Sequence, residues 1–154
     1  MKKILIVFVA VCFSFASCKN ENVVNPQITL GKATITGTVR ADLDVTNDSP
    51  AKTNEKVSGK TVVASVSTKD LVSNPGTVTY GTKFYTTTTD TNGKYSIDVE
   101  VRTDNAAMTV TVVPQDFEAV TSPGTDPVQF IGNTARKTVS VYNGGTFLLD
   151  ITYP

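Results

Sequence analysis

The sequence predicts an all-β fold, an antiparallel β-sandwich of about seven strands. Thr and Val together make up close to a third of its 154 residues, and their branched side chains suit strands better than helices because they are stiff at χ1. Several short segments alternate between apolar and polar residues and are separated by Gly, Asn and Pro. No segment after residue 18 has the 3.6-residue period of a helix, so short strands joined by turns are expected.

The first strand is expected to start at Ala33. From there, Ile35, Gly37, Val39 and Ala41 share one face, and threonines occupy most of the other face. This alternation is typical of a strand that buries one side.

The middle of the chain contains one long polar segment and two further strands. Residues 43–60 are expected to form a loop with a short strand piece. A strand is expected at 61–68, and another at 77–89 with a break near Gly81. In the first of these the inward-facing residues are expected to be Val62, Ala64 and Val66.

The strongest turn signal is Asn92-Gly93. These residue types tolerate a positive φ at both central positions of a tight turn, which favours a reversal between two strands. The strand that follows alternates regularly. Its inward-facing residues are expected to be Tyr95, Ile97, Val99 and Val101.

The last third of the chain predicts three more elements. A strand at 108–113 ends at Pro114, which cannot donate to a sheet ladder. Residues 115–136 are expected to be a long loop, and a strand follows at 138–142. After the turn at Asn143-Gly144-Gly145, the inward residues of the last strand are expected to be Phe147, Leu149, Ile151 and Tyr153.

The first eighteen residues have the layout of a secretory signal. Two lysines precede an apolar run from Ile4 to Phe15, and small residues precede Cys18. The run is too short to cross a bilayer, which needs about 20 residues. Residues 15–18 resemble the lipobox of bacterial lipoproteins. That resemblance implies cleavage before Cys18 and attachment of acyl chains such as palmitate to this residue, and two or three chains anchor a protein firmly.

The expected organisation therefore has three parts. Residues 1–17 form a lipoprotein signal peptide, residues 18–32 the lipidated Cys and a tether, and residues 33–154 the sandwich domain. The polar residues 19–22 resemble the tag that follows the lipid Cys in surface lipoproteins of Bacteroidetes-type bacteria. We expect an outer-membrane lipid anchor, with the domain facing the periplasm or the cell surface.

The composition excludes several classes of chemistry. The sequence contains no His, and its two Cys, Cys12 and Cys18, both lie at the amino end. Catalysis by a Ser-His or Cys-His pair and zinc binding by His are therefore excluded. The balanced charge, with 14 basic and 14 acidic residues, gives no sign of nucleic-acid binding. We expect no enzyme activity, no cofactor and no metal.

Residues 33–113 resemble the carboxypeptidase regulatory-like domain, a transthyretin-like (prealbumin-like) sandwich close to Cna-B-type modules. Residues 35–39, Ile-Thr-Gly-Thr-Val, are similar to its opening strand, and residues 88–97 to its central hairpin. Residues 108–112 look like the strand that follows this hairpin. The resemblance implies a non-catalytic accessory, adhesive or structural role and transfers no binding residue, since a fold alone does not define a function.

Two polar clusters and one set of acids contain residue types that could form chemical sites. Asp44, Asn47 and Asp48, or Asp90 and Asn92, could bind calcium, but neither cluster supplies six to eight oxygens and turn formation is favoured. Glycoside hydrolysis needs two carboxylates a few ångströms apart. The acids considered for it are expected on a solvated face: Asp98, Glu100 and Asp150.

Two further sites depend on aromatic rings and lysines. An aromatic platform for sugar would stack rings on apolar sugar faces, although packing of these rings is favoured. An isopeptide bond of the Cna-B kind would join Lys32 or Lys60 to Asn143, with no motif to support it. The aromatic residues considered are Tyr80, Phe84, Tyr85 and Phe130.

The leading hypothesis is a membrane-anchored lipoprotein that acts as a non-catalytic structural or protein-interaction module at the cell envelope. The alternative is a carbohydrate-binding accessory module of a polysaccharide-handling system. The expected partners are the membrane, through the lipid on Cys18, and an envelope protein or a glycan.

Overall fold

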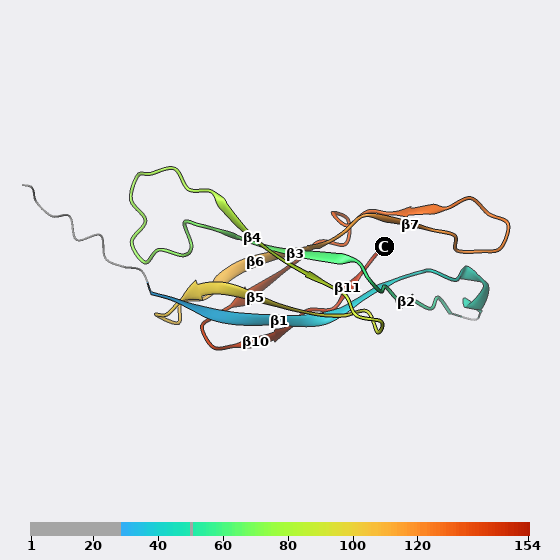
Figure 1. Ribbon diagram of the computed structural model, residues 1–154, viewed down its shortest axis with the longest axis horizontal. Coiled ribbons are helices and arrows are strands. Elements are labelled where there is room, and N and C mark those ends of the chain that lie inside the picture. Colours follow the sequence, from blue (N-terminus) through green and yellow to red (C-terminus); the bar gives the residue numbers. More distant parts are fainter. Residues whose placement is uncertain (1–28, 50) are drawn as a thin grey trace, which may run out of the picture.

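The computed structural model describes residues 29–49 and 51–154, which form two packed β-sheets and a projecting β-hairpin (Figure 1). The predicted β-sandwich is confirmed. Cys18 and the signal and lipobox predictions lie outside the described residues.

The first sheet is organised around strand β1 (Leu30–Ala41). On one edge β1 pairs antiparallel with β5 (Lys94–Arg102) and then with the two-residue β2 (Glu55–Lys56). On its other edge it pairs in parallel with β10 (Thr146–Leu148) and β11 (Ile151–Thr152). The parallel pairing departs from a purely antiparallel sandwich, and alternation along a strand does not reveal the direction of its neighbour.

The second sheet has four antiparallel strands in the order β4-β3-β6-β9. These are β3 (Thr61–Ser67), β4 (Thr82–Thr88), β6 (Met108–Pro114) and β9 (Lys137–Val141). The edge strand β4 lies beside β5 of the first sheet, and β9 lies beside β10.

The core lies between the two sheets and is built from alternate residues of their strands. The inward residues predicted for β1, β3 and β5 are buried, which confirms these alternations. Burying a valine or isoleucine side chain contributes about 1.5–3 kcal/mol, so a continuous apolar layer of this kind stabilises the domain without disulfides. The largest fully buried side chains are Tyr153, Ile35, Ile151, Val39, Val57, Val62, Val66, Val99, Val101, Val110, Val112 and Val141.

Two strands begin at clearly different residues from those that the sequence predicts. The first strand begins at Leu30 rather than Ala33, because Leu30 to Lys32 pair with the end of β5. The strand expected over 77–89 begins only at Thr82, and the residues before it form bends and irregular structure.

The long loop expected over residues 115–136 is wrong in part. It contains a hairpin of β7 (Phe117–Ala119) and β8 (Val128–Phe130), whose strands are only three residues long. Such short strands alternate too briefly to be recognised beside Pro123, Gly124 and Pro127.

The reversal at Asn92-Gly93 exists, but its geometry differs from the prediction. Gly93 alone has a positive φ, of 69°, and its N–H donates to the carbonyl of Asp90. The Asp90 carboxylate accepts the N–H groups of Asn92 and Lys94, both at 2.8 Å. An Asp at the first position favours this arrangement, because its side chain satisfies backbone donors of the turn. The turn carries the chain from the second sheet to the first.

The closing strand, which consists of β10 and β11, is interrupted between these two parts, where it passes Gly37 of β1. The Leu149 N–H donates to the Thr36 carbonyl, while the Thr38 N–H donates to the carboxylate of Asp150 at 2.8 Å. The Asp150 side chain therefore replaces a backbone acceptor at the interruption. A side chain at position 37 would overlap the Leu149 carbonyl.

We expect Gly37→Ala to destabilise the domain by about 1–3 kcal/mol, because the added methyl group must displace the backbone of the closing strand. Chemical denaturation would measure the change in the free energy of unfolding. Gly76→Ala is the matched control, since no atom of the described residues lies within 4 Å of a Cβ there and φ is not positive. Equal stability of the two variants would contradict the close approach at Gly37.

Candidate functional site

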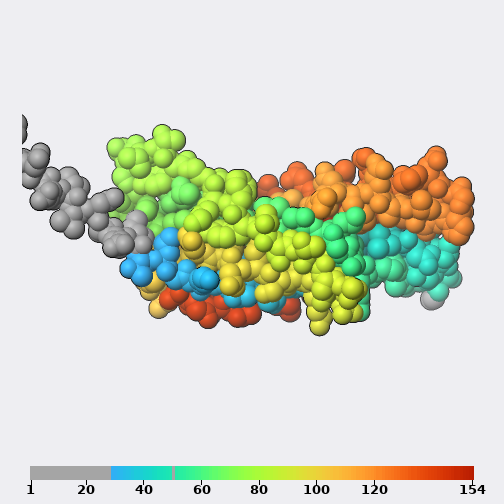
Figure 2. Space-filling model, in the orientation of Figure 1, coloured from blue at the N-terminus to red at the C-terminus, as the bar shows by residue number. Residues whose placement is uncertain are grey.

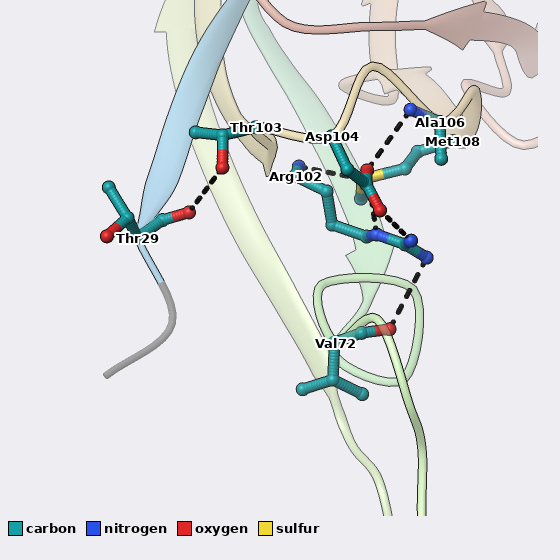
Figure 3. A network of polar contacts seen from close by, with 7 residues as sticks. All are labelled: Thr29, Val72, Arg102, Thr103, Asp104, Ala106 and Met108. Atoms are coloured by element: carbon teal, nitrogen blue, oxygen red, sulfur yellow. Dashed lines mark hydrogen bonds and ion pairs between the residues drawn. The ribbon is translucent and has the colours of Figure 1, made fainter. Parts of the chain in front are cut away.

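The sandwich has two different ends, and the described chain enters at one of them (Figure 1). At this end, the Thr103 hydroxyl donates to the backbone carbonyl of Thr29 at 3.2 Å, just before β1 begins (Figure 3). We call this end, which contains Thr29 and the turn between β5 and β6, the entry end.

A polar network holds the entry end together (Figure 3). The Arg102 guanidinium pairs with the Asp104 carboxylate and donates to the Val72 carbonyl at 3.4 Å. Asp104 also accepts the N–H of Ala106 at 3.1 Å. The hydrogen bond from Arg102 holds the pKa of Asp104 below its usual range. The network therefore ties the loop after β3 to the β5–β6 turn.

Two segments project beyond the sandwich at the opposite end (Figure 1). One consists of residues 42–49 and 51–56, and the other is the β7–β8 hairpin with its turn at 120–127. We call these two segments together the tip. They lie against each other (Figure 2), and the Val45 N–H donates to the Thr121 carbonyl at 3.0 Å.

An aromatic cluster supports the hairpin at its base. The rings of Phe117 and Phe130 stack with centroids 4.8 Å apart, and Tyr153 meets both rings edge-on at 5.1 and 5.9 Å. The Tyr153 hydroxyl donates to the Gln115 carbonyl, and burial raises the pKa of this tyrosine above its usual range. The ammonium of Lys60 lies 5.1 Å from the Phe117 ring centroid. The hairpin is thus fastened to the core by the last strand.

Glu55 organises the other segment of the tip. Its carboxylate accepts the N–H groups of Leu43 at 2.8 Å and of Asp44 at 3.2 Å, and the side-chain amide of Asn47 at 3.1 Å. The hydrogen bond from Asn47, together with the backbone donors, lowers the pKa of Glu55. One ionised side chain therefore holds the short 3-10 turn Val45–Asn47 in place.

The surface of the tip combines apolar and acidic residues. Val45, Val120 and Val128 are 44%, 54% and 45% exposed. A hollow of about 410 Å³ opens between the two segments, and its lining includes Leu43 and Pro123. Residues 42–56 and 116–130 contain seven acidic residues and two lysines.

A second and larger hollow, of about 570 Å³, lies where β4 and β5 meet. Six of its ten lining residues carry a hydroxyl group, and the others include one acid, one lysine and the exposed Leu148. We call the line along which β4 and β5 meet the seam. Farther along it, the Lys83 ammonium lies 2.6 Å from the Glu100 carboxylate, and this contact raises the pKa of Lys83. The hydroxyl-bearing residues of the hollow are Thr36, Thr38, Thr87, Thr88, Ser96 and the core residue Tyr95.

The aspartates considered for calcium bond the backbone of their own turns, as the turn interpretation predicts. Asp44 accepts the N–H of Thr46 at 3.0 Å, and Asp48 accepts the N–H of Thr53 at 2.6 Å. Within residues 29–49 and 51–154, no group of three or more His, Cys, Asp or Glu side chains is arranged to hold a metal ion.

The three carboxylates considered for catalysis have separate partners. Asp98 accepts the Thr34 hydroxyl at 2.8 Å, Glu100 pairs with Lys83, and Asp150 accepts the Thr38 N–H. The structure therefore gives each acid its own contact on the surface of the sandwich.

The aromatic residues considered for sugar binding do not form one platform. Phe130 is only 6% exposed and belongs to the cluster under the hairpin, whereas Phe84 is 66% exposed on β4. Tyr85 follows Phe84 on the same strand and is half-buried at the seam, so the two rings point to opposite faces. Tyr80 precedes β4.

The lysines considered for an isopeptide bond have other partners. The Lys32 side chain is 75% exposed and its ammonium lies 4.0 Å from Asp98, while Lys60 lies over Phe117. Asn143 is next to Gly31, where its side chain fills the space that a Cβ would need.

The sequence predictions missed the tip. Its two segments were expected as separate loops, at 43–60 and 115–136, and nothing in the local pattern indicates that they meet. The available signal was three isolated valines within polar, turn-rich segments. Because single exposed apolar residues are common on protein surfaces, these valines did not indicate a site.

Comparison with known proteins does not assign the chain to a family. No protein-family model matches the sequence, and no curated protein matches it significantly. Among the described residues, none belongs to a helix of the length and hydrophobicity that a membrane span requires.

We expect the tip to loosen in acid because of Glu55. A lowered pKa in the folded state means that Glu55 stabilises the fold at neutral pH, and that this contribution is lost as the pH falls below the usual glutamate range. Amide hydrogen exchange, corrected for intrinsic rates, should show reduced protection at Leu43 and Asp44 in acid.

Glu55→Gln should reduce this protection already at neutral pH. Glu118→Gln is the matched control, because among the described residues the Glu118 carboxylate accepts only the side-chain amide of Gln129 and no backbone N–H. Unchanged protection at Leu43 in Glu55→Gln would show that Glu55 does not organise the segment.

Proposed function

We propose that this chain is a lipoprotein anchored in the outer membrane by acyl chains on Cys18, and that its domain is a non-catalytic protein-interaction module of the cell envelope. The observation that carries the proposal is the opposite placement of the entry end and the tip (Figure 1). An anchor before β1 leaves the tip as the part of the domain farthest from the point of attachment.

The length of the tether supports this geometry. Eleven residues, 19–29, separate Cys18 from the first residue of β1. A chain of this length reaches at most about 40 Å when fully extended. The polar network of Arg102 and Asp104 stabilises the entry end, where the tether joins the domain (Figure 3).

The organisation of the domain supports an interaction role in the transthyretin-like group. When β10 and β11 are taken as one strand and the two-residue β2 is left out, seven principal strands form a sheet of three and a sheet of four. The loops of such sandwiches gather at the two ends, where a rigid scaffold presents them to partners. The carboxylates that could have supported catalysis have individual structural partners instead.

Mass spectrometry of the mature amino end, after expression of the full chain in a diderm bacterium, tests the anchor. We expect Cys18 to be the first residue and to carry diacylglycerol and an amide-linked acyl chain. Cys18→Ser should abolish the lipid and release the protein from the membrane fraction. Cys12→Ser is the matched control and should be processed normally. A mature chain that begins elsewhere, or an unmodified Cys18, would refute the anchor.

A second candidate function is carbohydrate binding at the hollow between β4 and β5. The observation that favours it is the lining of Thr and Ser hydroxyls around the exposed Leu148, since such groups can exchange hydrogen bonds with sugar hydroxyls. We expect Thr36→Val with Thr88→Val to reduce binding on a glycan array by about tenfold if this is the site. Absence of glycan binding by the native protein would exclude this function.

A further inference from the structure

The tip presents a hollow that the sandwich itself does not fill. Its apolar lining comes from Leu43, Val120 and Pro123, and polar residues, among them Asp44 and Thr46, complete the lining. Val120 is more than half exposed, although Thr121 beside it is buried. The hollow therefore offers accessible apolar surface among polar groups, where side chains of a partner can reach it.

The hollow is built on a supported frame. The stacked rings of Phe117 and Phe130 and the edge-on Tyr153 hold the hairpin, and Glu55 holds the opposite wall. The hydrogen bond from Val45 to Thr121 joins the two walls. A partner would thus meet a surface that needs little ordering on binding, which lowers the entropic cost of association.

The charge around the hollow indicates what kind of partner fits. The seven acidic residues and two lysines of residues 42–56 and 116–130 contrast with nine basic and six acidic residues in the rest of the described chain. The acids include the exposed Glu118 and Asp126 beside the hairpin turn. The net negative charge of the tip attracts cations and repels anions, including the headgroups of anionic lipids.

We propose that the tip docks a polypeptide segment with an apolar centre flanked by basic residues, supplied by another protein of the cell envelope. The apolar centre would occupy the hollow between residues 43–46 and 120–123, and the flanking cations would face the acidic residues of the tip. This inference rests on the proposed interaction function and specifies the surface and the chemistry of its partner.

A synthetic peptide can serve as the probe. The peptide Lys-Lys-Val-Leu-Val-Lys-Lys, labelled at its amino end, would be titrated with the full chain in non-ionic detergent and followed by fluorescence anisotropy. Two control peptides carry the same label. In one, glutamates replace the lysines, and in the other, serines replace the three apolar residues. We expect both to bind at least about tenfold more weakly, because charge and apolar burial both contribute.

Variants locate the binding surface. Val120→Ser should weaken binding by about fivefold, and Asp126→Asn should weaken it by about twofold and reduce its salt dependence. Val78→Ser is the matched control, because Val78 is also largely exposed, at 66%, but precedes β4 away from the tip. A photo-crosslinking version of the peptide should label residues 43–46 or 119–128.

Several outcomes would overturn the inference: no binding of the basic peptide, equal binding of the acidic peptide, equal loss in Val78→Ser and Val120→Ser, or crosslinks confined to the β4–β5 seam. The assay does not depend on lipidation. If Cys18 carries no lipid but the chain binds the peptide at the tip, the anchor is refuted and the docking surface stands. If Cys18 is lipidated but the chain does not bind the peptide, the docking surface is refuted and the anchor stands.

Discussion

The structure depends on the pairing of β1 along both of its edges. Among the described residues, β2, β5, β10 and β11 each pair with β1 and with no other strand, so the first sheet exists only through this twelve-residue strand. The alternation of β1 also sets which residues face the core, because side chains of a strand point in turn to opposite faces. Its Gly37 allows the closing strand to approach at the interruption, where the Asp150 carboxylate satisfies the Thr38 N–H.

The same strand relates the two ends of the molecule to each other. β1 begins at the entry end, beside the network of Arg102 and Asp104, and runs toward the segments of the tip (Figure 1). The parallel closing strand runs in the same direction and carries Tyr153 to the base of the hairpin. An attachment before β1 and a binding surface at the tip would consequently be connected through paired strands, which suits a module that presents its loops on a rigid body.

The tip and the seam offer different chemistry to a partner. The tip combines exposed valines with an excess of carboxylates, whereas the hollow between β4 and β5 joins hydroxyl-bearing residues and apolar surface with only one acid and one lysine. Apolar contact with charge complementarity favours a protein partner, because burial supplies affinity and charge supplies specificity and speed of association. This contrast is the physical basis for ranking protein interaction above carbohydrate binding.

The sequence by itself determined the fold class and the inward faces of β1, β3 and β5, because these follow from local alternation. It also determined the roles of Asp90 and Asp48 as turn residues, because their side chains bond nearby backbone groups. Only the tertiary structure decided the parallel pairing of β1 with the closing strand and the β7–β8 hairpin. It also decided the burial of Phe130 under Tyr153 and the meeting of residues 43–46 with 120–123. These features join segments far apart in the chain, and contacts between such segments leave no periodic trace in either of them.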